Sequence, residues 1–295
     1  MLKSLYLLSI LAASTSSIFV PKPPGPYDVY HRTTKLVDTA RTDPFAHQLE
    51  HRAVLTTIFI PTICLVPVRP TAYIPSAAAT FYTQLFNTYG LAIPVNTLTS
   101  LKLKACPHLP STTSTPQPSD FPIVLFSPGL GTTRLFYTIL AQTLASRGYI
   151  VVSVDHPHDT EFLEFPDGTI VTAANITDDL VPLDVETRAR DLRFILDHLR
   201  SGALGMRASE TPHVAVLGHS LGGAAGAEAM RQDSRFCAGV NLDGSMFGPV
   251  IHRGIEANRS FLLFGHENKT HQTDPSWEDF MGNWQGGGLA ELELG

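Results

Sequence analysis

The feature that most constrains the fold is the alternation of short apolar runs with helical segments from residue 121 onward. The runs have the length of β-strands and carry few polar residues, so each is expected to be buried on both faces. Apolar strands separated by helices indicate a parallel sheet covered on both sides, which is an α/β fold. The predicted strands are PIVLF (122–126), YIVVSV (149–154), HVAVL (213–217), AGVNL (238–242), FLLF (261–264) and LAELEL (289–294).

Three helices are predicted between these strands. The first runs from about 132 to 146, the second begins near Asp184, which suits a helix N-cap, and the third begins at Leu221. The second helix carries an apolar stripe with the i, i+3, i+4, i+7 spacing that is typical of a helix packed on a sheet. The stripe consists of Leu192, Ile195, Leu196 and Leu199.

The N-terminal third is less regular. AVLTTIFIPT (53–62) predicts one long strand or a pair of strands. Residues 71–95 are apolar and aromatic without a clear period, which suits either core or a wall around a lipid site. The low-complexity segment 108–120 predicts a surface connection.

A G-x-S-x-G pentapeptide, Gly218–Gly222, lies between a predicted strand and a predicted helix. The glycines leave room for a strained turn that lifts the Ser220 hydroxyl clear of the sheet. The first N–H groups of the following helix then point toward whatever the serine attacks. A glycine-rich turn without chemistry is the alternative, but the strand–turn–helix context favours Ser220 as a catalytic nucleophile.

A nucleophilic serine also needs donors for the oxyanion and a histidine that is oriented by a carboxylate. The Leu221 N–H is one donor by position, and the Leu130 N–H in SPGLG (127–131) is the second candidate, with a plain turn as the alternative. Asp243 ends the strand that follows the nucleophile. It is preferred to Asp155 because the acid follows the serine along the chain in hydrolases with this elbow.

The motifs GPYDV, RTDPF, FSPGLG, GHSLGG, LDGSMFG and DPSW resemble those of the plasma-type platelet-activating factor acetylhydrolases, in a secreted fungal-like form. The resemblance covers most of the chain. It implies an α/β-hydrolase with a mostly parallel central sheet and helices on both faces. It also implies that Ser220 is the nucleophile, that Asp243 is the acid, and that Leu130 and Leu221 form the oxyanion hole.

By the same resemblance, the substrate is a glycerophospholipid at a lipid surface, from which a short or oxidised acyl chain is cleaved at the second position. The family implies no metal ion, no calcium requirement and no other cofactor. A general secreted lipase or carboxylesterase is one alternative, and a catalytically inactive binding protein is another.

The catalytic histidine is the part of the family pattern that this sequence does not match. In the family it follows the last strand, whereas LAELEL is followed here only by Gly295. We therefore expect that the chain stops before its general base, and the alternative is that His266 or His271 replaces it. Three further histidines are assigned structural or substrate-lining roles: His156, His158 and His219.

The N-terminus predicts a secretory signal at residues 1–17, since an apolar run of residues 5–13 is followed by small residues. The run is too short for a bilayer core of about 30 Å, so no transmembrane segment is expected, and a buried helix is the alternative. Residues 18–295 would then form a single secreted α/β-hydrolase domain that lacks its C-terminal segment. Three N-x-[ST] sequons fit export: Asn175, Asn258 and Asn268.

Three cysteines leave one unpaired. Cys64 and Cys106 lie in loop-like surroundings, whereas Cys237 begins an apolar strand. We therefore predict a Cys64–Cys106 disulfide and a buried thiol at Cys237. The alternative is three free thiols in a reducing compartment, which requires that the predicted signal be wrong.

Composition excludes one class of partner. The chain has 21 basic and 27 acidic residues, for a net charge of -6, and it has no basic tract. A nucleic-acid partner therefore has no electrostatic support. With 295 residues, 43% of them hydrophobic, the chain is long enough to bury a substantial core.

Overall fold

The computed structural model describes residues 17–110, 117–118, 121–202, 214–255 and 258–295. The chain divides into two compact units. In the described part, the smaller unit holds residues 17–21 and 70–104, and the larger holds residues 22–69 and those from 105 onward. All of the predicted secretory signal except Ser17 lies outside the described residues, as does the middle of the predicted connection at 108–120.

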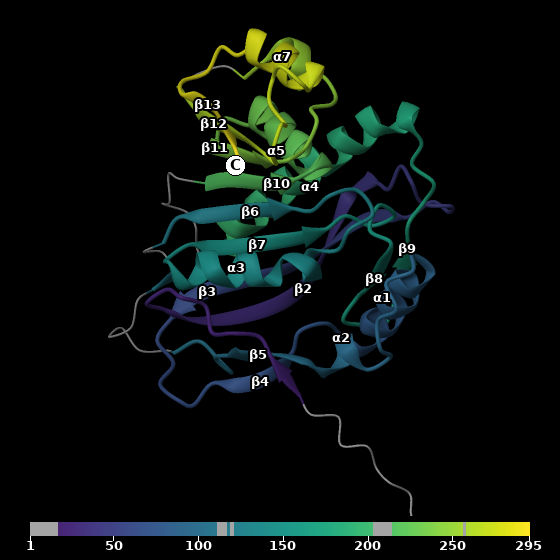
Figure 1. The fold of residues 1–295 in the computed structure, drawn as a ribbon, viewed down its shortest axis with the longest axis vertical. Helices are drawn as coiled ribbons and strands as arrows, with labels where there is room; N and C mark the ends of the chain where they lie inside the picture. The colour runs from purple at the N-terminus through teal and green to yellow at the C-terminus, as the bar shows by residue number, and fades with distance from the viewer. Residues whose placement is uncertain (1–16, 111–116, 119–120, 203–213, 256–257) are drawn as a thin grey trace, which may run out of the picture. The chain divides into compact units, whose positions relative to one another are not determined.

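The larger unit is built on an eight-stranded sheet (Figure 1). The first six strands of the sheet order are mutually parallel, and the last two pair antiparallel at one side. In sheet order the strands are β13 (Leu289–Glu293), β12 (Ser260–Gly265), β11 (Phe236–Leu242), β10 (Val214–His219), β6 (Ile123–Ser127), β7 (Ile150–Asp155), β3 (His51–Thr62) and β2 (Asp28–Thr42).

The predicted strands of the second half are all present, with ends that shift by one or two residues. β6 and β7 are buried along their whole length, as expected for central strands that are covered on both faces. The prediction of a long strand at 53–62 is also confirmed by β3. β2 was not predicted, because polar residues interrupt its apolar positions, as is usual for an edge strand with one face toward solvent.

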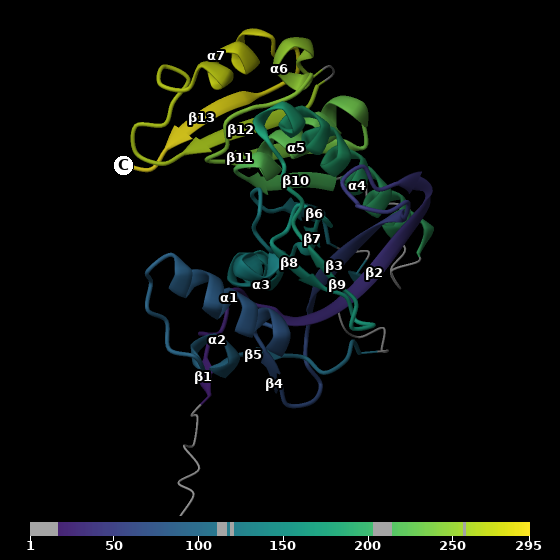
Figure 2. The same cartoon turned by 90° about the vertical axis from the view of Figure 1, so that its right-hand side faces the viewer.

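Helices cover both faces of the sheet (Figure 2). The pleat of the strands decides which side chains meet which helix. Val124 and Phe126 of β6 pack toward α3, whereas the alternate residues Ile123 and Leu125 join the core that contains the apolar stripe of α4. The helices are the 3-10 helix η2 (Arg134–Tyr137), α3 (Thr138–Ser146), the 3-10 helix η3 (Asp178–Leu180), α4 (Val181–Ser201), α5 (Leu221–Gln232), α6 (Val250–Arg253) and α7 (Pro275–Gly282). A hairpin of β8 (Phe162–Glu164) and β9 (Ile170–Thr172) lies between β7 and α4 in sequence.

The start of α4 corrects one prediction. The helix begins at Val181, with Leu180 at the N-cap position, so Asp184 is not the cap. Asp184 instead lies in the first turn, is fully buried, and accepts a hydrogen bond from Arg188 Nε at 3.1 Å. The prediction failed because a buried arginine one turn away competes for the carboxylate. The predicted stripe on α4 is confirmed, since all four of its side chains are buried.

The smaller unit contains a three-stranded sheet and two helices. Its elements are β1 (Ile18–Phe19), β4 (Arg69–Ala72), α1 (Ser76–Thr88), α2 (Thr97–Ser100) and β5 (Leu101–Ala105). α1 buries Ala78, Ala79 and Tyr82. Part of the apolar segment 71–95 is therefore core, which was one of the two alternatives predicted for it. Among the helices that the structure describes, none is both long and apolar enough to cross a membrane.

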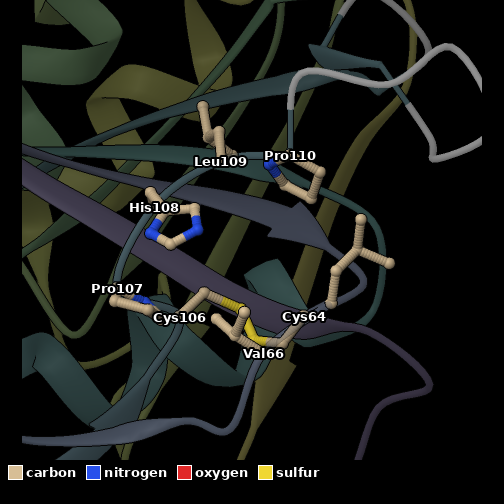
Figure 3. A pocket seen from close by; sticks show the side chains of 8 residues that line it. Cys64, Val66, Cys106, Pro107, His108, Leu109 and Pro110 are labelled. Atoms are coloured by element: carbon tan, nitrogen blue, oxygen red, sulfur yellow. A yellow bond between two sulfur atoms is a disulfide. The ribbon is translucent and has the colours of Figure 1, made fainter.

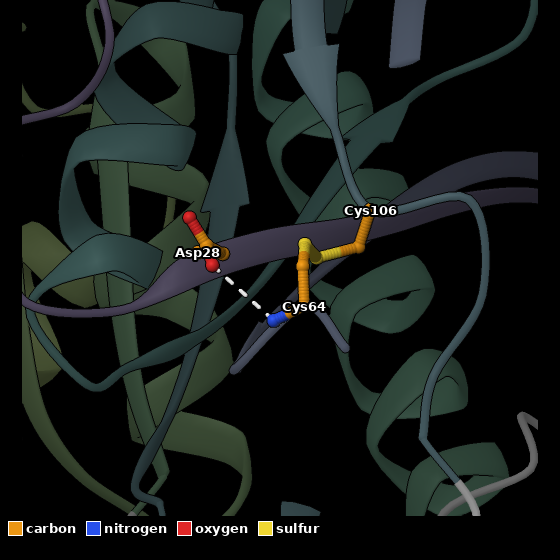
Figure 4. Close-up of side chains that lie close together, drawn as sticks. All are labelled: Asp28, Cys64 and Cys106. Carbon is orange, nitrogen blue, oxygen red and sulfur yellow. Dashed lines mark hydrogen bonds between the residues drawn. A yellow bond between two sulfur atoms is a disulfide. The ribbon is translucent and has the colours of Figure 1, made fainter. Parts of the chain in front are cut away.

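A disulfide joins Cys64 to Cys106 within the larger unit, with a Cα–Cα distance of 5.7 Å (Figure 4). The predicted pairing is therefore confirmed, although Cys237 is only partly buried. The Cys64 N–H donates to Asp28 Oδ2 at 3.2 Å, which ties the bond to the start of β2. Closing 42 positions of sequence destabilises the unfolded chain by roughly 4 kcal/mol. A cavity of about 160 Å³ beside the bond is lined by Cys64, Leu65, Val66, Cys106, Pro107, His108, Leu109 and Pro110 (Figure 3).

Candidate active site

Ser220 occupies a strained turn between β10 and α5. Its backbone has φ 52° and ψ -127°, a conformation that costs a non-glycine residue free energy and that is found where function requires it. A Cβ atom on Gly218 would lie 2.1 Å from the carbonyl carbon of Gly222, and one on Gly222 would lie 2.1 Å from Ser127 O. The Ser220 N–H donates to Leu242 O at 2.8 Å. Both glycines are therefore required for the chain to turn this sharply at the end of β10.

The segment Pro128–Gly131, here called the β6 loop, lies directly against this turn. A Cβ atom on Gly129 would be 3.2 Å from His219 Nδ1 and 3.3 Å from Ser220 Cβ, so a larger residue would require its neighbours to shift by a few tenths of an ångström. Leu130 follows and is 41% exposed. No described residue accepts a hydrogen bond from the Leu130 N–H. Leu221 opens α5, where the first N–H groups have no acceptor within the helix. Both predicted oxyanion donors thus belong to segments that flank Ser220.

Asp243 follows β11 with φ 61°, and its own N–H donates to Phe264 O at 2.8 Å. Its Oδ1 accepts the His266 N–H at 3.0 Å and bonds His266 Nδ1 at 2.5 Å. Burial on its own would raise the pKa of Asp243, but the hydrogen bonds and charge of His266, with the charge of Lys269, hold that pKa below its ordinary value. Asp243 is therefore an ionised partner for an imidazole.

The Asp243 carboxylate orients the His266 ring. A carboxylate only accepts hydrogen bonds, so Nδ1 donates to Asp243, and Nε2 is the ring nitrogen that does not bond this carboxylate. The His266 side chain is 65% exposed, and that of Asp243 is 38% exposed. The pair is thus open to solvent and to a substrate.

The other candidate histidines contact different groups. His271 bonds Glu291 at 3.1 Å, and His158 bonds Glu50 at 2.9 Å. His219 Nδ1 bonds the Tyr137 hydroxyl at 2.9 Å. Burial lowers the pKa of His219, with the charge of Asp243 acting in the opposite direction. Among the described histidines, the one that bonds to Asp243 is therefore His266, which the sequence offered only as an alternative.

A hollow of about 430 Å³ opens beside the Asp243–His266 pair. Its wall is polar, and two of its groups are ordered by an ion pair between Lys269 Nζ and Asp274 Oδ2 at 2.8 Å. The volume is within the range of small-molecule sites. The hollow is lined by Ser245, His266, Asn268, Lys269, Thr273, Asp274 and Pro275.

One further group of side chains has the donor types of a metal site, at a distance in sequence from the elbow. The donor atoms of Asp43, Glu50 and His158 lie within 4.8 Å of one another. Asp43 is, however, paired with the buried Arg52 guanidinium at 2.7 Å, and His158 is paired with Glu50. A cation bound there would have to displace these contacts and lie against a guanidinium charge.

Comparisons with known proteins identify the family. The family model for platelet-activating factor acetylhydrolase, isoform II, matches residues 13–163, and an α/β hydrolase family model matches residues 124–292. A probable 1-alkyl-2-acetylglycerophosphocholine esterase from Arthroderma benhamiae is 30% identical over 282 residues, which cover 92% of this chain and 71% of that protein. This chain belongs to the platelet-activating factor acetylhydrolase family. The predicted family and the predicted α/β-hydrolase fold are confirmed.

More distant relatives agree. The platelet-activating factor acetylhydrolase of Cavia porcellus is 29% identical over 173 residues, which cover 48% of this chain and 39% of that protein. A solved ferulic acid esterase from Streptomyces cinnamoneus has a TM-score of 0.76 and 29% identity, covering 95% of this chain and 77% of that one. These relatives are all named as esterases or acetylhydrolases. The family and the fold are therefore those of a carboxylic ester hydrolase.

Proposed function

We propose that this chain is a secreted serine esterase that removes a short or oxidised acyl chain from the sn-2 position of glycerophospholipids resembling platelet-activating factor. The observation that carries the proposal is Ser220 on its strained elbow, with the β6 loop against it and an ionised Asp243 that orients His266. The substrate class is supported by the family and by the relative named a 1-alkyl-2-acetylglycerophosphocholine esterase. A polar hollow beside His266 suits a polar head group.

The proposed mechanism is acyl transfer through the serine. Ser220 Oγ attacks the ester carbonyl while His266 Nε2 takes its proton, and Asp243 stabilises the imidazolium that forms. The N–H groups of Leu130 and Leu221 hold the oxyanion of the tetrahedral intermediate. Collapse of the intermediate expels the lysophospholipid alkoxide, which takes the proton from His266. Water, activated by the same imidazole, then releases the acyl group as a free acid.

A substrate panel tests this function. The secreted protein is assayed with 1-alkyl-2-acetyl-glycerophosphocholine, with its 2-palmitoyl analogue, and with methyl ferulate, each alongside Ser220→Ala. We expect the acetyl phospholipid to be preferred at least about tenfold in kcat/KM, since differences in pocket fit are typically worth 10- to 200-fold. A preference for methyl ferulate would favour a general esterase, the function that the similarity to the ferulic acid esterase supports. Wild-type rates equal to those of Ser220→Ala on every substrate would indicate a binding protein.

Export is part of the proposal. We infer that residues 1–17 are removed as a secretory signal and that glycans are added at exposed sequon asparagines, of which Asn175 and Asn258 lie outside the hollow beside His266. The Cys64–Cys106 disulfide supports an oxidising compartment. N-terminal sequencing of secreted protein and its mobility before and after endoglycosidase treatment test both points. A secreted chain that still begins at Met1 would refute the signal.

A further inference from the structure

We propose that Arg188 and Asp159 are positioning residues that aim the Leu130 N–H at the developing oxyanion. The inference rests on the proposed esterase function and deepens it, since it concerns how the same site is held. Neither residue is expected to contact the substrate, because the exposed fraction of each is 2% or less. Their effect on the reaction would act through the β6 loop.

The contacts of Arg188 and Asp159 bracket Leu130 from both sides. Arg188 Nη1 donates to Pro128 O at 2.6 Å, two residues before Leu130. The Gly131 N–H, one residue after it, donates to Asp159 Oδ1 at 3.2 Å. Arg188 Nε in turn donates to Asp159 Oδ2 at 2.6 Å. The loop, the arginine and the carboxylate therefore form one closed ring of hydrogen bonds.

Two further carbonyl groups of the β6 loop are also occupied. Gly129 O accepts the Thr132 N–H at 3.2 Å and the Thr132 hydroxyl at 2.8 Å, and Gly131 O accepts the Glu161 N–H at 3.1 Å. The N–H groups of Gly129 and Leu130 have no acceptor among the described residues. Contacts with residues outside the loop thus hold the backbone on both sides of Leu130, and the Leu130 N–H remains available to donate to an oxyanion.

The charge state of the cluster fits a rigid support. Burial and the neighbouring Asp159 carboxylate raise the pKa of Asp184 to about 8, against the opposing charge of Arg188. Burial alone would raise the pKa of Asp159, but Arg188 and a hydrogen bond with Asp184 hold it low. The Arg188 guanidinium is therefore paired with an ionised Asp159 carboxylate. Pairing of this kind avoids most of the penalty of an isolated buried ion.

The α4 helix connects this cluster to the sheet. Arg188 lies on the same helix as the apolar stripe, and Asp159 lies in the segment between β7 and β8. A guanidinium that bonds a carboxylate and a carbonyl at once needs its planar fork, which a lysine ammonium lacks. Arg188→Lys should therefore keep the positive charge and lose the bracket around the loop.

The test compares Arg188→Lys with Arg259→Lys in the otherwise intact chain. Arg259 is also a buried arginine that donates to main-chain carbonyls, Met230 O and Asp233 O, but it lies next to the amino end of β12, away from the carboxyl ends of the strands. Active sites are counted by fluorophosphonate titration, and melting temperature is measured for each variant. The affinity of an acyl trifluoromethyl ketone reports on the oxyanion hole, because its hemiketal with Ser220 places an oxyanion there. A non-hydrolysable sn-2 ether phospholipid reports on ground-state binding.

We expect Arg188→Lys to lower kcat/KM per titrated site about 10²-fold, the scale of removing or displacing one oxyanion donor. Affinity for the trifluoromethyl ketone should fall in parallel, with the ether phospholipid bound within about twofold of wild type, because only the transition-state contact is lost. Asp159→Asn, which keeps an acceptor for the Gly131 N–H, should lose less. Arg259→Lys should lower the melting temperature without changing either quantity per site.

Two results would overturn the inference. If Arg188→Lys and Arg259→Lys both lose only stability, with kcat/KM and ketone affinity unchanged, then Arg188 is a structural residue. If wild type neither hydrolyses the substrates nor titrates with fluorophosphonate, the proposed function fails and this inference fails with it. The wild-type measurement thus separates the two failures.

Discussion

Two sets of serine, histidine and aspartate occur in the larger unit, and they differ in access. Ser127 Oγ bonds His156 Nε2 at 3.0 Å, and His156 Nδ1 bonds Asp191 Oδ2 at 2.8 Å. This buried set forms a complete hydrogen-bonded chain, and all three residues are fully buried. Ser127 ends the regular strand β6 and is not on a strained turn.

The exposed set has the opposite character. Ser220 has a strained backbone and the Asp243–His266 pair is open to solvent. Hydrogen bonds join Asp243 to His266, but among the described residues none joins Ser220 Oγ to His266. The comparison teaches that the three residue types and their hydrogen bonds do not make a catalytic triad. A nucleophile also needs access for the substrate, a turn that presents its hydroxyl, and nearby N–H donors. The buried set is not accessible to a substrate, and its hydrogen bonds hold the end of β6 in place.

The largest expected effect separates the two serines. Ser220→Ala should abolish fluorophosphonate labelling and lower kcat on p-nitrophenyl acetate by roughly 10⁴- to 10⁶-fold, as loss of a nucleophile does in serine hydrolases. Ser127→Ala should still label, and should lose about 1–3 kcal/mol of stability because His156 Nε2 is left without its partner. Mass spectrometry of the labelled peptide checks the assignment. A label on the Ser127 peptide would reverse the roles of the two sets.

The next effect concerns the histidines of the exposed set. His266→Ala should lower kcat by roughly 10³-fold or more with little change in melting temperature, since the side chain is mostly exposed and acts in proton transfer. His271→Ala is the matched control, because His271 also bonds a carboxylate nearby but not Asp243, and it should stay within about twofold of wild type.

If His266→Ala hydrolyses the substrate as fast as the control His271→Ala, then His266 is not the general base. That result would fit the family pattern, in which the catalytic histidine follows the last strand. Steady-state hydrolysis of p-nitrophenyl acetate by the two variants and wild type is sufficient for this decision.

The smallest effect is a pH dependence of stability that belongs to the buried set. Burial lowers the pKa of His156, against the opposing effect of its hydrogen bond to Asp191, so the folded protein holds this imidazole neutral. In the unfolded chain a histidine titrates near 6.5. Below that pH the unfolded state binds more protons than the folded state, so stability is lost as pH falls. His156→Gln should reduce this slope between pH 6.5 and 5 by up to about 1.4 kcal/mol per pH unit.

Urea unfolding at a series of pH values measures the slope. His266→Ala serves as the comparison and should keep the wild-type slope, because its side chain is exposed. Identical slopes for wild type and His156→Gln would mean that His156 binds protons equally in the folded and unfolded states, and the contrast between the two sets would then be weaker than the burial indicates.

The elbow and the strands were predictable because their signals are local. A run such as PIVLF is buried on both faces wherever it lies in a parallel sheet, and Gly218 and Gly222 are required by the turn itself. The disulfide was also predictable, since only one of the three cysteines begins an apolar strand. The edge strand β2 and the start of α4 were not, because both depend on polar residues whose partners are distant in sequence.

The candidate site shows the same division. Ser220 and Asp243 follow from strand ends and chain order, which are properties of the sequence. The choice between His266 and His271 does not, because the two lie five residues apart in one loop and both bond a carboxylate. Only the register of β12 against β11 decides that His266 lies on Asp243, since Phe264 O accepts the Asp243 N–H and brings the two loops together.

The sequence by itself determined the α/β fold and the position of the elbow, because apolar periodicity and glycine sterics act within a few residues. The family followed from the resemblance of its motifs to those of known proteins. The tertiary structure decided which histidine pairs with Asp243, which serine is accessible, and which buried charges hold the β6 loop. Those outcomes depend on contacts between residues that are 23 to 60 positions apart, such as Asp243 with His266 and the Pro128 carbonyl with Arg188. Long-range contacts of this kind exist only after the sheet has set its strand order and register.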